Sequence, residues 1–272
     1  MFYNIIKNII NVGCVVKSIY ICIVFKRCIM INENKNINLH ISVDCVLIGF
    51  DGENFKALLV RQMGGISGDN YNTMKLPGSL IYDDEDLDEA AKRVLNELTG
   101  LKNVKMTQFK AYGSKDRTRN PKDVVWLERF HQLDERKIDR IVTIAYLSLV
   151  KIDRKLEDLS DKYDASWMSV NEIETLAFDH LQILKDALVY IRHYVEIAPS
   201  LMFDLLPRKF TAAQLRTLFE LIYDKTYDVR NFHKKISLMP YVVALDEKQI
   251  GVSHRAARFY KFDRTIYNKY GR

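Results

Sequence analysis

The sequence predicts an α/β domain followed by a winged helix-turn-helix domain. Residues 38–170 alternate short apolar strands with one amphipathic helix, and a second helix follows at residues 178–195, a pattern typical of a mixed sheet covered by helices. Residues 211–263 then predict helix, turn, basic helix and hairpin. From Pro207 to the end, 14 Lys and Arg stand against 6 Asp and Glu, although the whole chain carries only +6. A basic C-terminal part on an acidic body indicates a polyanion as its partner, and an ordinary solvated surface is the alternative.

The strands come first along the chain. "NLHISVDCVLIGF" (38–50) is rich in β-branched residues, and the turn "DGEN" joins it to "FKALLVRQ" (55–62), which predicts a hairpin. Further strands are expected around "MKLPGSL" and at residues 104–113, 139–150 and 165–170. Residues 63–73 form a Gly/Asn loop. The insertion at 118–138 is longer than a hairpin needs and has room for a helix of its own.

Two helices complete the first domain. Residues 86–99 have an acidic first turn and are followed by Gly100, which predicts both ends of a helix. Residues 178–195 form the second helix, and Asp179 is its expected N-cap. Helices on opposite sides of the mixed strands predict an α/β/α sandwich.

The C-terminal segment carries the DNA-binding pattern. Residues 211–225 place Leu215, Leu218, Phe219 and Ile222 on one helix face. Residues 228–239 predict a shorter basic helix, with Phe232 directed inward together with Ile236. Residues 240–263 predict two strands joined by a polar loop, the wing.

Residues 79–101 resemble the Nudix box, G-x5-E-x7-R-E-U-x-E-E-x-G-U, where U is aliphatic. Ser79 replaces the first glycine, and Val94 and Leu98 replace two of the three acids that share one helix face in an active box. One remaining carboxylate cannot supply the hard oxygen ligands that Mg²⁺ requires, so we expect no metal, no cofactor and no hydrolysis. The matching positions are Glu85, Arg93, Leu95, Glu97, Gly100 and Leu101.

Residues 38 to 264 as a whole resemble the Nudix-related transcriptional regulators. The resemblance rests on "AYGSKDR" (111–117), "RIVTIAYLSLV" (140–150), "FDH" (178–180) and "LLPRKFTAAQLRTLFELIYDKTYDVRNFHKKI" (205–236). It implies a Nudix-like sensor domain at 38–200 and a winged helix domain at 201–272. Some members sense ADP-ribose, and the chain most resembles a branch that senses pentoses such as arabinose. The expected function is a repressor of sugar utilisation released by L-arabinose. The alternative is a Nudix hydrolase of a nucleoside diphosphate derivative such as ADP-ribose.

A regulator of this kind needs two sets of site residues, one for DNA and one for the effector. The expected partners are a double-stranded DNA operator, a pentose or an ADP-ribose-like nucleotide, and a second copy of the chain. Glu97 has a second interpretation as the i,i+4 partner of Arg93, His180 is expected to be structural, and Trp167 is expected in the core. The DNA-binding candidates are Arg230, Asn231, His233, Lys234, Lys235, Ser253, His254 and Arg255; the effector candidates are Ser79, Glu97, Asp116 and Arg117.

The N-terminal 37 residues form an extension. All four cysteines lie at or before Cys45 without a C-x-x-C pair, which indicates a reduced, cytoplasmic protein without a zinc site. Residues 8–30 are apolar but interrupted by Lys17, so we expect no membrane contact. The favoured interpretation is a start at Met30, and the alternatives are a weak membrane anchor and a disordered or packed extension.

Overall fold

The computed structural model describes residues 36–62, 73–117, 140–152, 156, 164–251 and 256–270. The N-terminal extension up to residue 35, most of the predicted loop at 63–73, the insertion at 118–138 with Trp126, and the tip of the wing lie outside these residues. In the part of the chain that is described, no helix has both the length and the apolar character needed to cross a bilayer.

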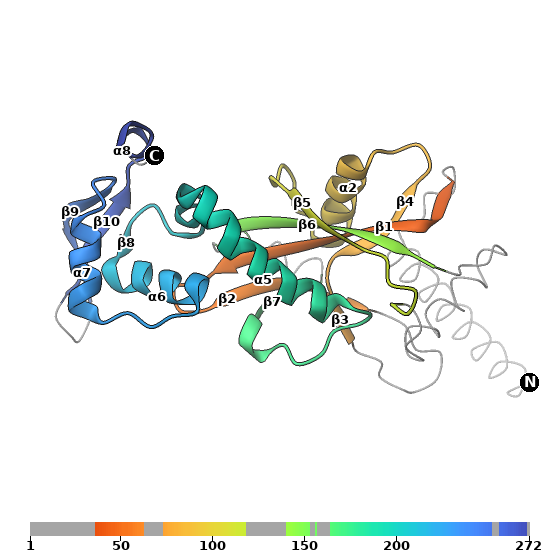
Figure 1. Cartoon of the computed structure of the whole chain (residues 1–272), viewed down its shortest axis with the longest axis horizontal. Coiled ribbons are helices and arrows are strands. Elements are labelled where there is room, and N and C mark those ends of the chain that lie inside the picture. The colour runs from red at the N-terminus through yellow and green to blue at the C-terminus, as the bar shows by residue number, and fades with distance from the viewer. Residues whose placement is uncertain are drawn as a thin grey trace, which may run out of the picture.

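A mixed sheet of seven strands forms the first domain (Figure 1). Its central strand β1 pairs in antiparallel with β2 and β4 on one side and in parallel with β6 on the other, from Ile41 opposite Val142 to Phe50 opposite Lys151. The order is β3-β2-β1-β6-β5, with β7 on β2. The strands are β1 (Ile37–Phe50), β2 (Phe55–Gln62), β3 (Thr73–Lys75), β4 (Gly78–Tyr82), β5 (Thr107–Tyr112), β6 (Val142–Lys151) and β7 (Ala165–Ser169).

Side-chain alternation along β1 divides the domain into two cores. Val43, Cys45 and Leu47 pack with α2 (Leu87–Thr99), whereas Val46 and Ile48 pack with α5 (His180–Ile197). Successive side chains of a strand point to opposite faces, so the two helices cover opposite faces of the sheet (Figure 1). The predicted α/β/α sandwich is therefore confirmed.

A short 3₁₀ segment, η1 (Val170–Glu172), lies between β7 and α5, and a second one, η2 (Pro199–Leu205), leads from α5 into the second domain. Its elements gather at one end of the molecule (Figure 1). The three-stranded order β8-β10-β9 and the two helices before the hairpin form a winged helix, as predicted. The elements are β8 (Phe210–Thr211), α6 (Ala212–Tyr223), α7 (Val229–Ser237), β9 (Val242–Lys248), β10 (Arg258–Phe262) and α8 (Arg264–Tyr270).

Helix ends follow ordinary capping chemistry with one exception. Gly100 ends α2 in a left-handed conformation at φ 73°, and Thr211 caps α6 by accepting from the Gln214 amide at 3.2 Å. Asp179 does occupy the N-cap position of α5, but its side chain makes no capping hydrogen bond. The prediction that it caps this helix is wrong, because Arg117 engages both of its carboxylate oxygens.

Candidate effector pocket and DNA-binding helix

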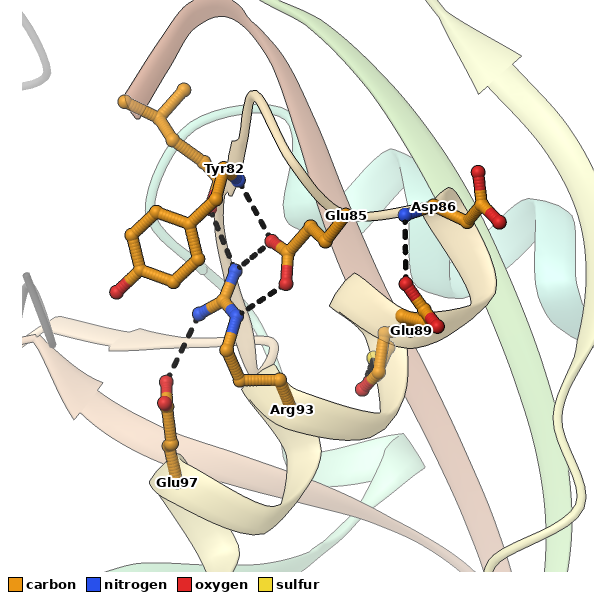
Figure 2. Close-up of polar contacts among 9 residues, drawn as sticks. Tyr82, Glu85, Asp86, Glu89, Arg93 and Glu97 are labelled. Carbon is orange, nitrogen blue, oxygen red and sulfur yellow. Dashed lines mark hydrogen bonds and ion pairs between the residues drawn. The ribbon is translucent and has the colours of Figure 1, made fainter. Parts of the chain in front are cut away.

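The residues retained from the Nudix box form an ion-pair frame around Arg93 (Figure 2). The guanidinium donates to both Glu85 oxygens at 2.5 and 2.8 Å, to the Leu80 carbonyl at 3.1 Å and to Glu97 at 3.0 Å. Glu85 also accepts from the Tyr82 amide at 2.8 Å, and the Tyr82 ring lies 4.2 Å from the guanidinium carbon. Arg93 therefore ties α2 to the β4 strand and the turn that follows it.

The two carboxylates keep Arg93 charged. Burial lowers the pKa of Arg93, but the hydrogen bonds and charges of Glu85 and Glu97 outweigh it and raise that pKa above its ordinary value. Burial raises the pKa of Glu97, and the charge of Arg93 opposes this. Glu97 thus has the role of an i,i+4 partner, the second interpretation of the sequence.

The former metal-binding face of α2 does not fit a divalent ion. The Val94 side chain is fully buried in the apolar core between α2 and the sheet, and Leu98 packs against the same core. Glu85 and Glu97 are both held by Arg93. A cation here would meet two aliphatic side chains and two carboxylates that already have a partner, so its lost hydration would not be replaced.

A polar pocket lies on the opposite side of the sheet, beneath the start of α5. Its centre is Asp44, a buried carboxylate in the middle of apolar β1. Asp44 accepts from the Thr143 hydroxyl at 2.7 Å, and its other oxygen lies 3.4 Å from His180 Nε2. Gly78 leaves the necessary space, because a Cβ there would come within 1.8 Å of Asp44 Oδ1. The cavity has a volume of about 50 Å³ and is lined by Ser42, Asp44, Lys75, Gly78, Ser79, Leu80, Arg117, Ile141, Phe178 and His180.

His180 is held as a neutral imidazole in this pocket. The Leu76 amide donates to its Nδ1 at 3.0 Å, so Nδ1 carries no proton and Nε2 is the nitrogen that carries one, facing Asp44. Burial lowers the pKa of His180 below its ordinary value, and the charge of Asp44 opposes this. The structural role predicted for His180 is confirmed, and the residue also lines the pocket.

Arg117 provides a buried cation on the pocket wall. Its side chain is only 5% exposed and donates to the two Asp179 oxygens at 2.8 and 3.0 Å, and Asp44 lies 3.8 Å away. A second cation, Lys75, donates to the Gly78 carbonyl at 2.9 Å. Two cations, two carboxylates and a neutral imidazole therefore meet within one small polar space.

The sequence located only part of this pocket. Ser79 and Arg117 line it as expected, whereas Glu97 lies on α2 with Arg93, and Asp116 is not among the lining residues. Asp44, Lys75 and His180 were not assigned as effector contacts. The signal for Asp44 was present, since an acid inside a long apolar strand must have buried polar partners.

The second helix of the winged helix domain, α7, presents polar side chains to solvent. Arg230, Asn231, His233 and Lys234 are exposed, while Phe232 and Ile236 are buried, as predicted. Asp228 caps the helix by accepting from the Asn231 amide at 3.0 Å. These are the side-chain types that read guanine and adenine edges or contact phosphates.

Lys235 departs from the predicted set. Its ammonium lies 4.8 Å from the centre of the Phe219 ring and 5.1 Å from that of Tyr227, so it faces the turn between α6 and α7. Burial lowers its pKa, and the charge of Lys225 adds to this. A cation held over two rings fixes α7 against α6. The wing candidates Ser253, His254 and Arg255 lie outside the described residues.

Comparison with known proteins agrees with this architecture. Residues 38–187 match the Nudix domain family, and residues 202–262 match the NrtR DNA-binding winged helix domain. A relative described as the ADPR responsive transcriptional repressor NtrR of Acinetobacter baylyi is 22% identical over 228 residues, 81% of each chain.

Solved structures show the same fold over both domains. The crystal structure of Shewanella oneidensis NrtR complexed with a 27mer DNA has a TM-score of 0.59 and 21% identity, covering 85% of this chain and 96% of that chain. A second crystal structure of Shewanella oneidensis NrtR has a TM-score of 0.55 and 21% identity, covering 82% of this chain and 94% of that chain. This chain therefore belongs to the Nudix family and joins its Nudix domain to a winged helix domain of the NrtR type.

Proposed function

We propose that the chain is a DNA-binding transcriptional repressor whose Nudix domain binds a small effector and does not hydrolyse it. The observation that carries the proposal is the exposed face of α7, which presents Arg230, Asn231, His233 and Lys234 on a helix fixed in a winged helix domain. A transcriptional repressor of Acinetobacter baylyi that aligns over 81% of each chain supports the regulatory role.

The loss of hydrolysis follows from the residues of α2. Val94 and Leu98 are parts of an apolar core, and the retained acids are partners of Arg93. A Nudix hydrolase of ADP-ribose-like compounds is the alternative, and it requires carboxylates that this face does not offer.

Two classes of effector are the candidates for the polar pocket. ADP-ribose is supported by the Acinetobacter baylyi relative, which is an ADPR responsive transcriptional repressor. A pentose such as L-arabinose, with a role in sugar utilisation, is supported by the convergent donors and acceptors around Asp44 and Arg117, which suit hydroxyl groups. The repressor acts as a homodimer, because winged helix proteins commonly read two-fold operators.

The test is a gel shift of the full chain with the DNA upstream of its own gene, at two salt concentrations, with ADP-ribose, L-arabinose or D-xylose added. Salt-sensitive binding released by one of these compounds supports the repressor and identifies the effector class. Failure to bind that DNA, together with Mg²⁺-dependent cleavage of ADP-ribose, would establish the hydrolase instead.

A further inference from the structure

We propose that α5 couples the effector pocket to the DNA-binding domain, with Asp179 and Arg192 as the residues that position it. This inference rests on the proposed function and assigns the connection between the two domains to one helix. Asp179 lies at the pocket end of α5, and Arg192 lies close to α6.

The pocket holds the first turn of α5. Arg117 donates to both carboxylate oxygens of Asp179, and the Leu76 amide donates to His180. Because Arg117 engages Asp179, α5 begins without a side-chain cap, and Phe178 immediately before it has φ 55°, a conformation that few residues with a side chain adopt. The start of α5 is therefore fixed by pocket residues instead of by its own cap.

A second attachment lies two helical turns further along α5. Asp186 accepts from Lys110 at 2.5 Å and from the Tyr112 hydroxyl at 2.9 Å. Both donors belong to β5, and the chain runs from β5 directly to Arg117. Residues 110–117 thus hold α5 through two carboxylates seven residues apart on one helix face. Only the attachment at Asp179 involves a residue that lines the pocket.

The other end of α5 is built into the winged helix domain. Arg192 Nε donates to the Ile222 carbonyl in the last turn of α6 at 3.0 Å. Ile191 and Val195 belong to the same buried cluster as Leu218 and Ile222 of α6. With 18 residues, α5 spans about 27 Å, so this one helix reaches from the pocket to α6.

These attachments define how an effector acts. A ligand in the pocket that accepts hydrogen bonds from Arg117 competes with Asp179 for the same guanidinium. Loss of that pair leaves Asp186 as the remaining attachment to residues 110–117, and α5 tilts about it. The movement reaches α6 through Arg192, and α7 follows because Phe232 is buried against Phe219 of α6, with ring centres 5.4 Å apart.

The first experiment measures how strongly ADP-ribose and L-arabinose change the DNA affinity of the full chain. Asp179→Asn removes the charged pair, and Glu174→Gln makes the same charge change at an exposed position before α5. The quantity compared is the ratio of the DNA Kd with effector to the DNA Kd without effector. We expect this ratio to keep its wild-type value in Glu174→Gln and to be smaller by a factor of about five or more in Asp179→Asn. A wild-type ratio in Asp179→Asn would overturn the proposal.

Arg192→Met tests the other end of the helix. We expect it to bind the effector with wild-type Kd by calorimetry while its DNA affinity no longer responds, a separation that loss of stability alone does not produce. His193→Asn, an exposed neighbour on the same helix, should respond as the wild type does. An Arg192→Met variant that still responds fully would overturn the coupling role.

Hydrogen exchange separates failure of this inference from failure of the proposed function. Without DNA or effector, Asp179→Asn should exchange faster than Glu174→Gln at residues 212–223 of α6. If the wild type binds no DNA, the proposed function fails while this comparison still decides the coupling. Equal exchange at α6 in both variants would overturn the coupling even if the wild type is a repressor.

Discussion

The two faces of the central sheet differ in chemistry, because one carries an apolar core with an ion-pair frame and the other carries a polar pocket. On the α2 face, the acids that remain from the Nudix box hold the fold through Arg93, and the positions of the other two are aliphatic. On the α5 face, Asp44, Arg117 and His180 form a polar pocket whose covering helix continues into the DNA-binding domain. Under the proposed function, α2 serves as scaffold and the opposite face of the sheet binds the effector.

An acid restored to the α2 face should cause the largest loss of folding stability. Val94→Glu introduces a carboxylate at a position with no exposure, so we expect the free energy of unfolding to fall by about 4 kcal/mol. Leu98→Glu, at the half-buried edge of the same core, should cost about 1 kcal/mol. Urea denaturation measures both, and wild-type stability in Val94→Glu would mean that this face can accept acids.

Removal of Arg93, the centre of the ion-pair frame, should cause the next largest loss of folding stability. Arg93→Ala leaves Glu85 with 7% side-chain exposure and no guanidinium, and we expect a loss of about 3 kcal/mol. Arg61→Ala is the control, because its partner Asp164 and Arg61 itself are about half exposed, and it should lose less than about 1 kcal/mol. Equal losses would show that Arg93 is no more structural than a surface arginine.

Acid should weaken the pocket face through His180. Its pKa is lowered in the folded protein, so the unfolded chain takes up the proton first as the pH falls below 6.5. The stability contributed by neutral His180 is therefore full above pH 6.5 and decreases as the pH falls through its folded pKa. In thermal melts between pH 8 and pH 5, His180→Asn should show a smaller change in Tm than the wild type. The exposed His193→Asn variant should follow the wild type, and an identical profile in His180→Asn would contradict this assignment.

The smallest expected effect is a difference in the salt dependence of DNA binding between variants of two neighbouring lysines of α7. Lys234 is exposed, so Lys234→Ala should reduce the slope of log K for DNA against log salt by about 0.9 if it contacts a phosphate. Lys235 lies over the Phe219 and Tyr227 rings, so Lys235→Ala should leave the slope unchanged and lower the affinity at every salt concentration. Fluorescence anisotropy across a salt series measures both. A reduced slope in Lys235→Ala would return it to the DNA-contacting set.

Local patterns predicted the elements of this fold well. The end of α2 at Gly100 and the apolar stripe of α6 are encoded within a few residues, so the sequence alone was sufficient to predict them. The role of the Asp179 side chain could not be predicted in this way. Its partner Arg117 is 62 residues away, and Asp179 accepts hydrogen bonds from Arg117 instead of from the amides of its own helix.

The pocket was harder to predict because its residues come together only through the tertiary fold. Asp44 and Thr143 lie 99 residues apart and meet through the parallel pairing of β1 with β6. The Nudix box directed attention to α2 and Glu97, the face that the fold uses as scaffold. The surroundings of Lys235 were hidden for a similar reason, since a basic residue on a basic helix gives no local indication that two aromatic rings lie beneath it.

The parallel pairing of β1 and β6 has a consequence for biosynthesis. Ile41 pairs with Val142, so the central strand of the sheet leaves the ribosome about 100 residues before its parallel partner. At a synthesis rate of about 5–20 residues per second, the apolar β1 strand waits on the order of 5–20 s for that partner. During this time β2 and β4 can cover only one of its edges. The nascent chain therefore has a period in which one edge of β1 is unpaired, before α5 or the winged helix has been made.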